Sequence, residues 1–185
     1  MAGNGPFKRI FFYFMLAFFL VAVLQSRIFQ LKPKAGINPE QKREVINLAA
    51  RSLGSLDVPV GAIVTYEGSI IGRGYNTVQS DSNVAGHAEI NAINNAVRKL
   101  GLRTFANLDR DKLILYSTFE PCEMCKGAIL HYNIERVRFM KDKSPMYWNK
   151  VQLKSFDYEL HKRRISGEKS QDSLFNLHPE FPGRK

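Results

Sequence analysis

The stretch LILYSTFEPCEMCKGAILHYNIERVRFM, residues 113–140, decides the fold of this chain of 185 residues. Its first six residues form a short apolar run that predicts a buried strand. Residues 122–132 then predict a helix with two cysteines near its start, and residues 136–140 predict another strand. Strands that alternate with helices indicate an α/β domain with partly parallel strand pairing.

The residues upstream extend this pattern. Asn38-Pro39-Glu40 predicts a helix start, with a capping side chain, a proline at the first position and an acid in the first turn. Residues 60–66 and 70–75 predict two strands of a hairpin, and residues 87–100 predict a second helix. We therefore expect a three-layer α/β/α sandwich with a mixed sheet, preceded by one N-terminal hydrophobic helix.

Two short motifs point to a metal site. His87-Ala88-Glu89 and Pro121-Cys122-Glu123-Met124-Cys125 together offer three zinc ligands, His87, Cys122 and Cys125, and one nearby carboxylate, Glu89. Structural zinc sites are closed by four protein ligands, whereas catalytic sites keep one position open for water. Three ligands beside a carboxylate therefore predict a hydrolytic site with one Zn²⁺ per chain. Zinc-activated water would be the nucleophile, and Glu89 would take its proton and later deliver it to a leaving amine.

The spacing of these residues suggests how they are held. Cysteines three residues apart share one face of a helix, and Pro121 fits the first helical position. Gly86 can act as a permissive cap for the helix that begins with His87. Two helix N-termini would then face the metal and favour ionised thiols.

Other interpretations of the cysteines and their neighbours are weaker. A lone C-x-x-C can be a redox pair, but the upstream H-x-E motif and the preceding proline favour a metal. His131 is the nearest spare histidine for a closed site, yet it falls six residues after Cys125 and therefore on another helix face. Glu123 is expected to be a solvated acid of the first turn, and Glu120 can lie near the pocket rim.

Longer motifs carry a family resemblance. DVPVGAIV, GRGYN, HAEINAI and STFEPCEMCKGAI occur in this order between residues 57 and 129. Over residues 37–140 the chain resembles the cytidine deaminase-like superfamily, and most of all the branch of tRNA adenosine deaminase, guanine deaminase and cytosine deaminase. The resemblance implies that Asn76 contacts the substrate base or sugar, although Gly-Tyr-Asn also suits a loop, and it implies a homodimer. The chain departs from the branch at residues 83–86 and at the bulky residues 141–148, where the substrate pocket is shaped.

The N-terminus predicts a membrane segment. Residues 1–36 hold an uninterrupted apolar run from Ile10 to Leu24, flanked by basic residues. Because no small-residue cleavage site follows the run, a retained single-pass anchor is preferred over a cleaved signal. The excess of positive charge after the run favours a catalytic domain facing the cytoplasm. We expect a deaminase domain over residues 37–165 and a polar, loosely ordered tail over residues 166–185.

Charge bears on the substrate. The net charge is +10, but residues 37–140 hold 12 basic and 11 acidic residues, so the surplus lies in the flanks. Basic and aromatic residues alternate in the segment after residue 146 and would suit RNA, as they would suit a solvated helix. The sequence thus predicts a zinc-dependent hydrolytic deaminase of a free nucleobase, nucleoside or nucleotide of the guanine or cytosine type. The alternatives are a tRNA adenosine deaminase that makes inosine and, in another class, a non-catalytic zinc-binding membrane scaffold.

Overall fold

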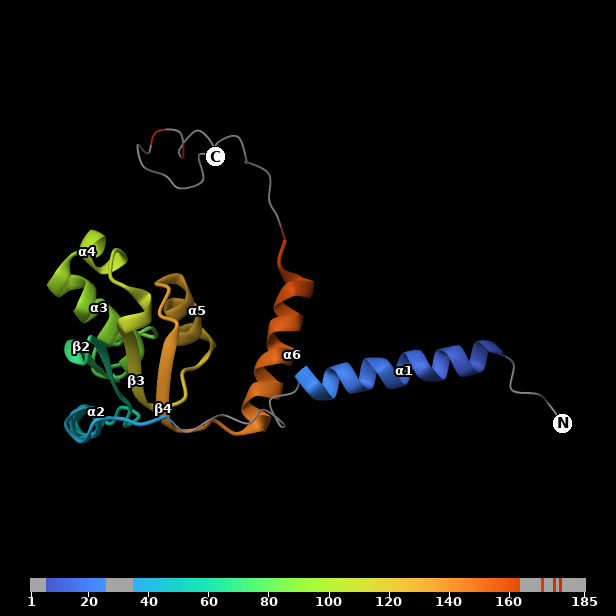
Figure 1. The fold of residues 1–185 in the computed structure, drawn as a ribbon, viewed down its shortest axis with the longest axis horizontal. Helices are drawn as coiled ribbons and strands as arrows, with labels where there is room; N and C mark the ends of the chain where they lie inside the picture. Colours follow the sequence, from blue (N-terminus) through green and yellow to red (C-terminus); the bar gives the residue numbers. More distant parts are fainter. Residues whose placement is uncertain (1–5, 26–34, 164–170, 172–174, 176, 178–185) are drawn as a thin grey trace. The chain divides into compact units, whose positions relative to one another are not determined.

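The computed structural model describes residues 6–25, 35–163, 171, 175 and 177 (Figure 1). The chain divides into two compact units, residues 1–149 and residues 150–185, and the first unit holds the sheet and the candidate site. The tail predicted over residues 166–185 lies almost entirely outside the described residues. The expected domain boundaries stay a prediction.

The core of the first unit is a four-stranded mixed sheet. Its strands are β1 (Gly61–Tyr66), β2 (Ser69–Tyr75), β3 (Leu113–Phe119) and β4 (Arg136–Lys141), in the spatial order β2-β1-β3-β4. β1 pairs antiparallel with both β2 and β3, whereas β3 and β4 are parallel. The parallel pair is the one that the strand-helix-strand pattern predicted, and the mixed sheet is confirmed.

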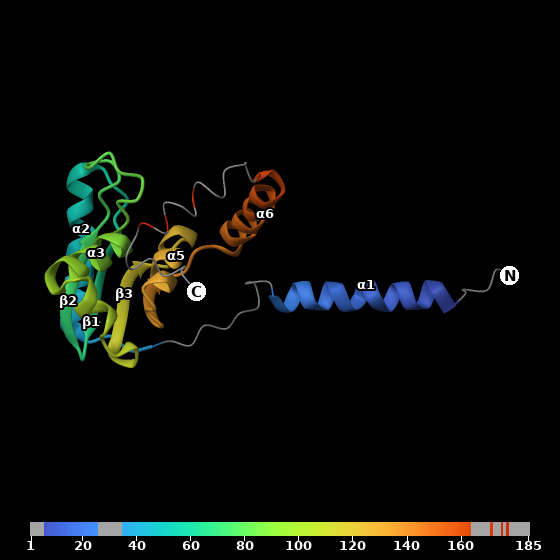
Figure 2. The same ribbon diagram turned by 90° about the horizontal axis from the view of Figure 1, so that it is seen from above.

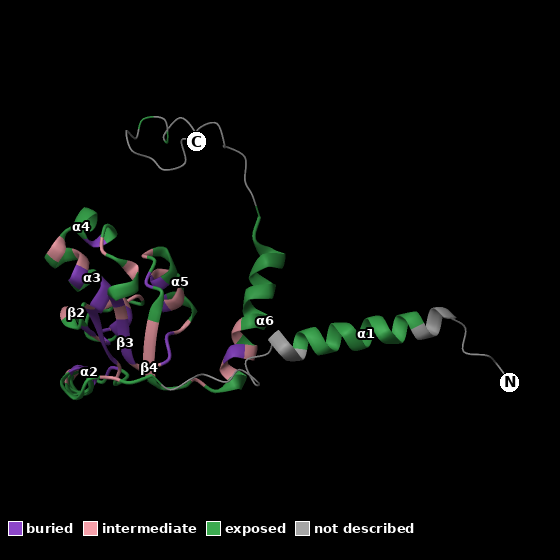
Figure 3. Ribbon diagram, in the orientation of Figure 1, coloured by how far each residue is buried: buried purple, intermediate pink, exposed green. Residues whose placement is uncertain are grey.

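Helices cover both faces of this sheet (Figures 1 and 2). α2 (Pro39–Arg51) packs on one face, through a core cluster that contains Val45 and Leu48. α3 (Ala88–Leu100) and α5 (Glu123–His131) pack on the other face, where Ala92 and Ile129 belong to one larger cluster. The three-layer sandwich is therefore confirmed, and its core is the buried band through the sheet in Figure 3.

Strand periodicity explains why the sheet is buried on both sides. Successive side chains of a strand point to opposite faces. In β1, Ala62 and Val64 join the α3 and α5 side, whereas Ile63 joins the α2 side, and all three are fully buried. A strand covered on both faces is a continuous apolar run, and this is how residues 60–66 appear in the sequence.

Several elements were not predicted from the sequence. α4 (Leu102–Ala106) and the short 3-10 helices Ser52–Ser55 and Arg110–Lys112 are too brief to show a helical period. α6 (Pro145–His161) begins in the first unit and continues into the second. Trp148 is the buried residue of α6, and the exposed remainder carries little periodic signal.

The predicted membrane anchor is wrong. The apolar run from Ile10 to Leu24 does form a helix, α1 (Pro6–Gln25). However, no helix among the described residues has both the length and the apolar character that crossing a bilayer requires. The run itself is shorter than the roughly 20 apolar residues of a typical span. The single-pass localisation, with its cytoplasm-facing domain, and the membrane as a partner are therefore withdrawn.

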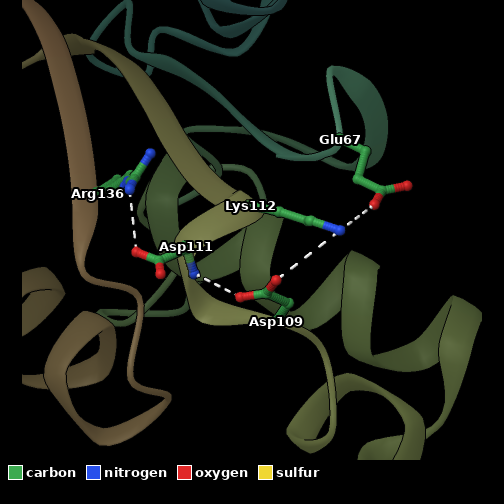
Figure 4. Close-up of polar contacts among 5 residues, drawn as sticks. All are labelled: Glu67, Asp109, Asp111, Lys112 and Arg136. Atoms are coloured by element: carbon green, nitrogen blue, oxygen red, sulfur yellow. Dashed lines mark hydrogen bonds and ion pairs between the residues drawn. The ribbon is translucent and has the colours of Figure 1, made fainter.

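A cluster of charged side chains pins the sheet at the end where β3 begins (Figure 4). Lys112 Nζ lies 2.7 Å from Glu67 Oε1, and Arg136 Nη2 lies 3.0 Å from Asp111 Oδ1. The side chain of Asp109 caps the turn by accepting a hydrogen bond from Asp111 N at 3.0 Å. These pairs are exposed and screened by solvent, so they add little to stability. They lie at the end of β3 opposite its carboxyl end.

Gly74 sets the distance between β2 and α3, and its replacement should be costly. A Cβ at this position would overlap the backbone of Ala88 and Ala92. We expect Gly74→Ala to lower the free energy of unfolding by at least about 1–3 kcal/mol, because the helix must move off the sheet. Urea unfolding checks this against Gly127→Ala, which has open space and should gain about 0.5–1 kcal/mol from helix propensity. Equal stability of the two variants would contradict the close approach.

Candidate metal centre and active site

Two helix starts meet at the carboxyl end of β3. His87 is the N-cap of α3 and Cys122 is the N-cap of α5, both with extended backbone, and Cys125 lies in the first turn of α5. The sequence had placed Pro121 and Cys122 inside the helix and made Gly86 the cap. The start of α5 lies later because Glu120 N donates to Lys141 O at 2.9 Å, which keeps the chain extended beside β4. Gly86 instead allows the chain to pass close to Thr77.

The three predicted ligands converge. Nδ1 of His87 lies 3.5 Å from Cys122 Sγ and 3.4 Å from Cys125 Sγ, and the two sulfurs lie 3.6 Å apart. Zinc binds sulfur at about 2.3 Å and imidazole nitrogen at about 2.0–2.1 Å, so the edges of a tetrahedral site are about 3.8 Å between sulfurs and about 3.6 Å from sulfur to nitrogen. The observed distances fit this geometry to within about 0.2 Å, the tolerance expected of a metal site.

The site offers three protein ligands rather than four. Among the described residues, His87, Cys122 and Cys125 form the only group of three or more potential metal-binding side chains whose ligand atoms all lie within 4.8 Å of one another. His131 is not part of it, is exposed, and packs edge-on against Tyr132 at 5.2 Å between ring centroids. A set of one imidazole and two thiols suits zinc and leaves a fourth position open, as catalytic sites do.

Glu89 reaches the same place from the first turn of α3. Its side chain is 4% exposed, and Oε2 lies 3.5 Å from Cys125 Sγ. Oε1 accepts a hydrogen bond of 3.2 Å from the hydroxyl of Ser117, on β3. Burial raises the pKa of Glu89, although its hydrogen bonds and the neighbouring His87 oppose the shift. Ser117 was not singled out in the sequence, where it is one residue of a buried strand.

The side chains of His87, Cys122 and Cys125 shift one another's pKa values. The hydrogen bond with Cys125 lowers the pKa of Cys122 to about 3, with a further contribution from His87 and against the effect of burial. The same pairing and burial raise the pKa of Cys125. The hydrogen bond with Cys122 raises the pKa of His87. Because zinc requires two thiolates and a neutral imidazole, its binding displaces these protons.

A cavity of about 280 Å³ opens onto the metal centre. His87, Glu89 and Cys122 supply polar groups at its lining, and Lys143 adds a cation. Its apolar lining consists of Leu56, Val58, Val60, Val78, Ala88 and Phe119. Apolar walls with a few fixed polar groups are typical of a site for a small molecule.

Asn76, for which the resemblance implied a contact with the substrate, is among the residues that line this cavity. Its side chain is 7% exposed, donates to Val58 O at 3.2 Å and accepts from Val78 N at 3.4 Å. The amide keeps one N–H and one lone pair for a ligand. Its contact with substrate stays a prediction.

Asp57 holds the cavity wall together. Its buried carboxylate accepts hydrogen bonds from Gln79 N at 2.6 Å, from Ser55 Oγ at 2.7 Å and from Ser80 N at 3.3 Å. Burial alone would raise the pKa of Asp57, but these hydrogen bonds outweigh it and the pKa is lowered. The carboxylate therefore joins the 3-10 turn after α2 to the loop that follows Asn76.

This pKa shift predicts a pH-dependent contribution to stability. Because the folded-state pKa of Asp57 lies below the unfolded value of about 3.9, its contribution is full above that pH and is lost as the pH falls through the folded value. We expect the wild type to be more stable than Asp57→Asn at neutral pH, and the difference to shrink below about pH 4. Urea unfolding of both proteins across this range checks it. A difference that is constant down to pH 3 would contradict the proposed role of the charge.

The loop after β4 closes one side of the cavity. Glu120 Oε2 accepts hydrogen bonds from Lys143 N at 2.9 Å and from Trp148 Nε1 at 3.1 Å. Glu120 is buried and does not line the cavity, so it organises the loop rather than the rim itself. Residues 141–148 are the bulky stretch that departs from the pattern of the branch. Two of them, Lys143 and Trp148, fix this loop through their hydrogen bonds to Glu120.

The family is now evident. Residues 39–141 match the model of the cytidine and deoxycytidylate deaminase zinc-binding region. The chain belongs to this family of zinc-binding deaminase domains, which confirms the resemblance and the zinc cofactor predicted from the sequence.

Individual relatives narrow the comparison. The chain is 38% identical over 91 residues to a tRNA-specific adenosine deaminase of Aquifex aeolicus, which covers 49% of this chain and 57% of the relative. It is 35% identical over 109 residues to the tRNA-specific adenosine deaminase of Haemophilus influenzae, covering 58% of this chain and 60% of that one. The chain thus spans less than two thirds of the length of these curated relatives.

Two solved structures share the fold. A tRNA:A34 deaminase of A-to-I editing at the wobble position superposes with a TM-score of 0.52 at 29% identity, covering 57% of this chain and 73% of that one. The guanine deaminase of Bacillus subtilis superposes with a TM-score of 0.58 at 25% identity, covering 78% of this chain and 99% of that one. The chain is therefore similar to deaminases of both substrate types.

Proposed function

We propose that this chain is a zinc-dependent hydrolytic deaminase of adenosine within RNA, of the kind found at the wobble position of tRNA. The observation that carries the deaminase assignment is the three-ligand metal centre beside the buried carboxylate of Glu89. The choice of RNA rests on relatives that are named tRNA-specific adenosine deaminases and are 35–38% identical. This favours the alternative drawn from the sequence over the guanine or cytosine type.

In the proposed mechanism, His87, Cys122 and Cys125 hold the metal. Zinc, when bound in such a site, supplies a water that is deprotonated near neutral pH. Glu89 accepts the proton of this water at a carboxylate oxygen and later donates a proton to the departing amine. The oxygen of water first forms a bond to the ring carbon; after Glu89 has donated the proton to the amine, the bond between that carbon and the nitrogen breaks and ammonia leaves. A raised pKa suits Glu89 to both steps, because its carboxyl group then holds the transferred proton more readily than an ordinary carboxylate does.

Two further side chains would position the reacting groups. The hydroxyl of Ser117 donates to Glu89 Oε1 and so leaves Oε2, the oxygen on the side of Cys125, to carry the proton. Asn76 would bind the base or the sugar through the N–H and lone pair of its amide that the protein does not use. Neither role needs movement of the backbone, since both side chains are already fixed.

A second candidate function has support of its own. The guanine deaminase of Bacillus subtilis superposes over 99% of its length, more than the tRNA deaminase does. The apolar cavity of about 280 Å³ would suit a free purine as it would suit a base turned out of RNA. The hypothesis of a non-catalytic membrane scaffold is not supported, because no helix among the described residues can span a membrane. A scaffold would also have no need of the buried Glu89 carboxylate beside the metal ligands.

Mapping of inosine separates the two candidates. The full chain would be incubated with a tRNA that carries adenosine at the first anticodon position, and with a matched tRNA that carries guanosine there. We expect inosine at that position of the first tRNA, and no change in the second. Deamination of free guanine without any inosine in the tRNA would replace the proposal with the second candidate.

A further inference from the structure

Lys143 occupies an unusual place in the cavity. Among the described residues that line it, Lys143 is the only lysine or arginine. Its ammonium nitrogen lies 3.6 Å from the ring centroid of Phe119 and 5.2 Å from that of Tyr147. Aromatic faces attract and partly desolvate a cation. The charge is thus held at the cavity wall instead of extending into bulk solvent.

The backbone under this lysine is also fixed. Lys143 N donates to the buried Glu120 carboxylate, which also accepts from the indole of Trp148, itself 3% exposed. A side chain whose backbone is anchored in the core loses less entropy on binding than one on a mobile surface loop. The arrangement is therefore preorganised for a ligand.

The protein itself does not neutralise this charge by direct pairing. Within residues 35–163, the ammonium of Lys143 forms no ion pair within 4.0 Å. Two carboxylates, Asp57 and Glu89, also line the cavity. Asp57 accepts hydrogen bonds from Ser55, Gln79 and Ser80, and Glu89 accepts one from Ser117. Glu89 and Glu120 act on the ammonium electrostatically but form no direct ion pair with it. A cation held in this way beside a cavity for a base is suited to an anionic group attached to that base.

We infer that Lys143 binds a phosphate group of the nucleotide whose base enters the cavity. This inference rests on the proposed deaminase function and names a determinant of its substrate class. Lysine acts toward phosphate as a compact point charge and needs no planar geometry. The phosphate is either the monoester of a free nucleotide or a diester of the RNA backbone, and both present the same oxygens.

Equilibrium binding tests the inference without requiring turnover. Binding would be measured for two proteins of verified zinc content: the Glu89→Ala variant, which keeps Lys143, and the double variant Glu89→Ala with Lys143→Met. The probes are adenosine, adenosine 5′-monophosphate and an anticodon stem-loop RNA with adenosine at its first anticodon position. Lys112→Met serves as the matched control, because Lys112 lies at the opposite end of β3 and pairs with Glu67 (Figure 4).

We expect Lys143→Met to weaken binding of a phosphate-bearing probe by about tenfold or more and to leave adenosine unchanged. For RNA, the slope of log Kd against log salt should decrease by about 0.7, the value of one phosphate contact to a single strand. Loss confined to the monophosphate identifies a free nucleotide, and loss confined to RNA identifies the backbone. Lys112→Met should change neither affinity nor slope, and Lys143→Arg should keep most of both.

Other results would overturn the inference. It fails if Lys143→Met weakens adenosine as much as the phosphate-bearing probes, since the lysine then only shapes the cavity. It also fails if the salt slope and all affinities are unchanged, or if none of the probes binds. Failure of the proposed function would be seen separately, in the wild-type protein loaded with zinc. That protein would release no ammonia, although its binding of phosphate-bearing probes still depended on Lys143.

Discussion

Glu89→Ala is expected to reduce kcat by roughly 10²–10⁴-fold or more, the usual contribution of a general acid–base group. The carboxylate is the proposed carrier of the proton that passes from water to the leaving amine, and it lies 3.5 Å from a ligand sulfur without being one of the three ligands. Zinc content should therefore stay at one per chain. Ammonia release and metal analysis on the same preparation check both statements.

Two variants serve as controls for the loss of Glu89. Glu89→Gln keeps the shape and the hydrogen bond from Ser117 but cannot carry the proton, so it should be as inactive as the alanine variant. Glu123→Ala removes an exposed carboxylate that pairs with Lys126 at 3.6 Å and should keep its activity. Full activity of Glu89→Ala with bound zinc would show that the proposed mechanism is wrong.

Cys122→Ala should lose both the zinc and a large part of the stability. Metal binding adds directly to the free energy of folding, by about 10–16 kcal/mol in small zinc peptides, and removal of one of three ligands forfeits much of that. Cys122 is the better cysteine to test, because Cys125 is fully buried and its truncation would also leave a cavity. Zinc content and the urea midpoint are the measurements.

A chelator distinguishes lost metal from lost packing. Removal of zinc should destabilise the wild type to about the level of Cys122→Ala and should leave that variant unchanged, because the two perturbations act on one interaction. Equal destabilisation of both proteins by the chelator would contradict the assignment of Cys122 as a ligand.

Regular elements could be predicted because their signals are local. Asn38 Oδ1 accepts from Glu40 N at 2.8 Å, as the capping pattern indicates, and the strands of the hairpin differ from their expected bounds by one residue. The starts of α3 and α5 were displaced for tertiary reasons. A hydrogen bond between Glu120 and β4 and the close passage of Gly86 past Thr77 decide where the helices begin, and neither is visible in a local pattern.

The metal site was predictable for a different reason. Residue type and number identify zinc ligands even when they are far apart in sequence, as His87 and Cys122 are. The supporting residues carry no such chemical mark. Ser117 resembles any polar residue in a strand. The position of Lys143 depends on the carboxylate of Glu120, which lies 23 residues before Lys143 in the sequence and 28 residues before Trp148, its other partner.

The N-terminal prediction failed because composition alone carried it. Fifteen apolar residues between basic flanks suggested a span, but length as well as apolar character is required, and the helix of this segment does not meet the requirement. Residues 37–140 are nearly neutral in net charge, and Lys143 is the only lysine or arginine among the described residues that line the cavity.

Ammonia release by the zinc-loaded full chain tests the central claim most directly. The substrates would be an anticodon stem-loop RNA with adenosine at the first anticodon position, free adenosine, guanine and cytosine. We expect ammonia from the RNA in equal amount to inosine. Ammonia release should stop when zinc is removed and return when zinc is restored. A folded, zinc-loaded chain that releases no ammonia from any of these substrates would contradict the claim.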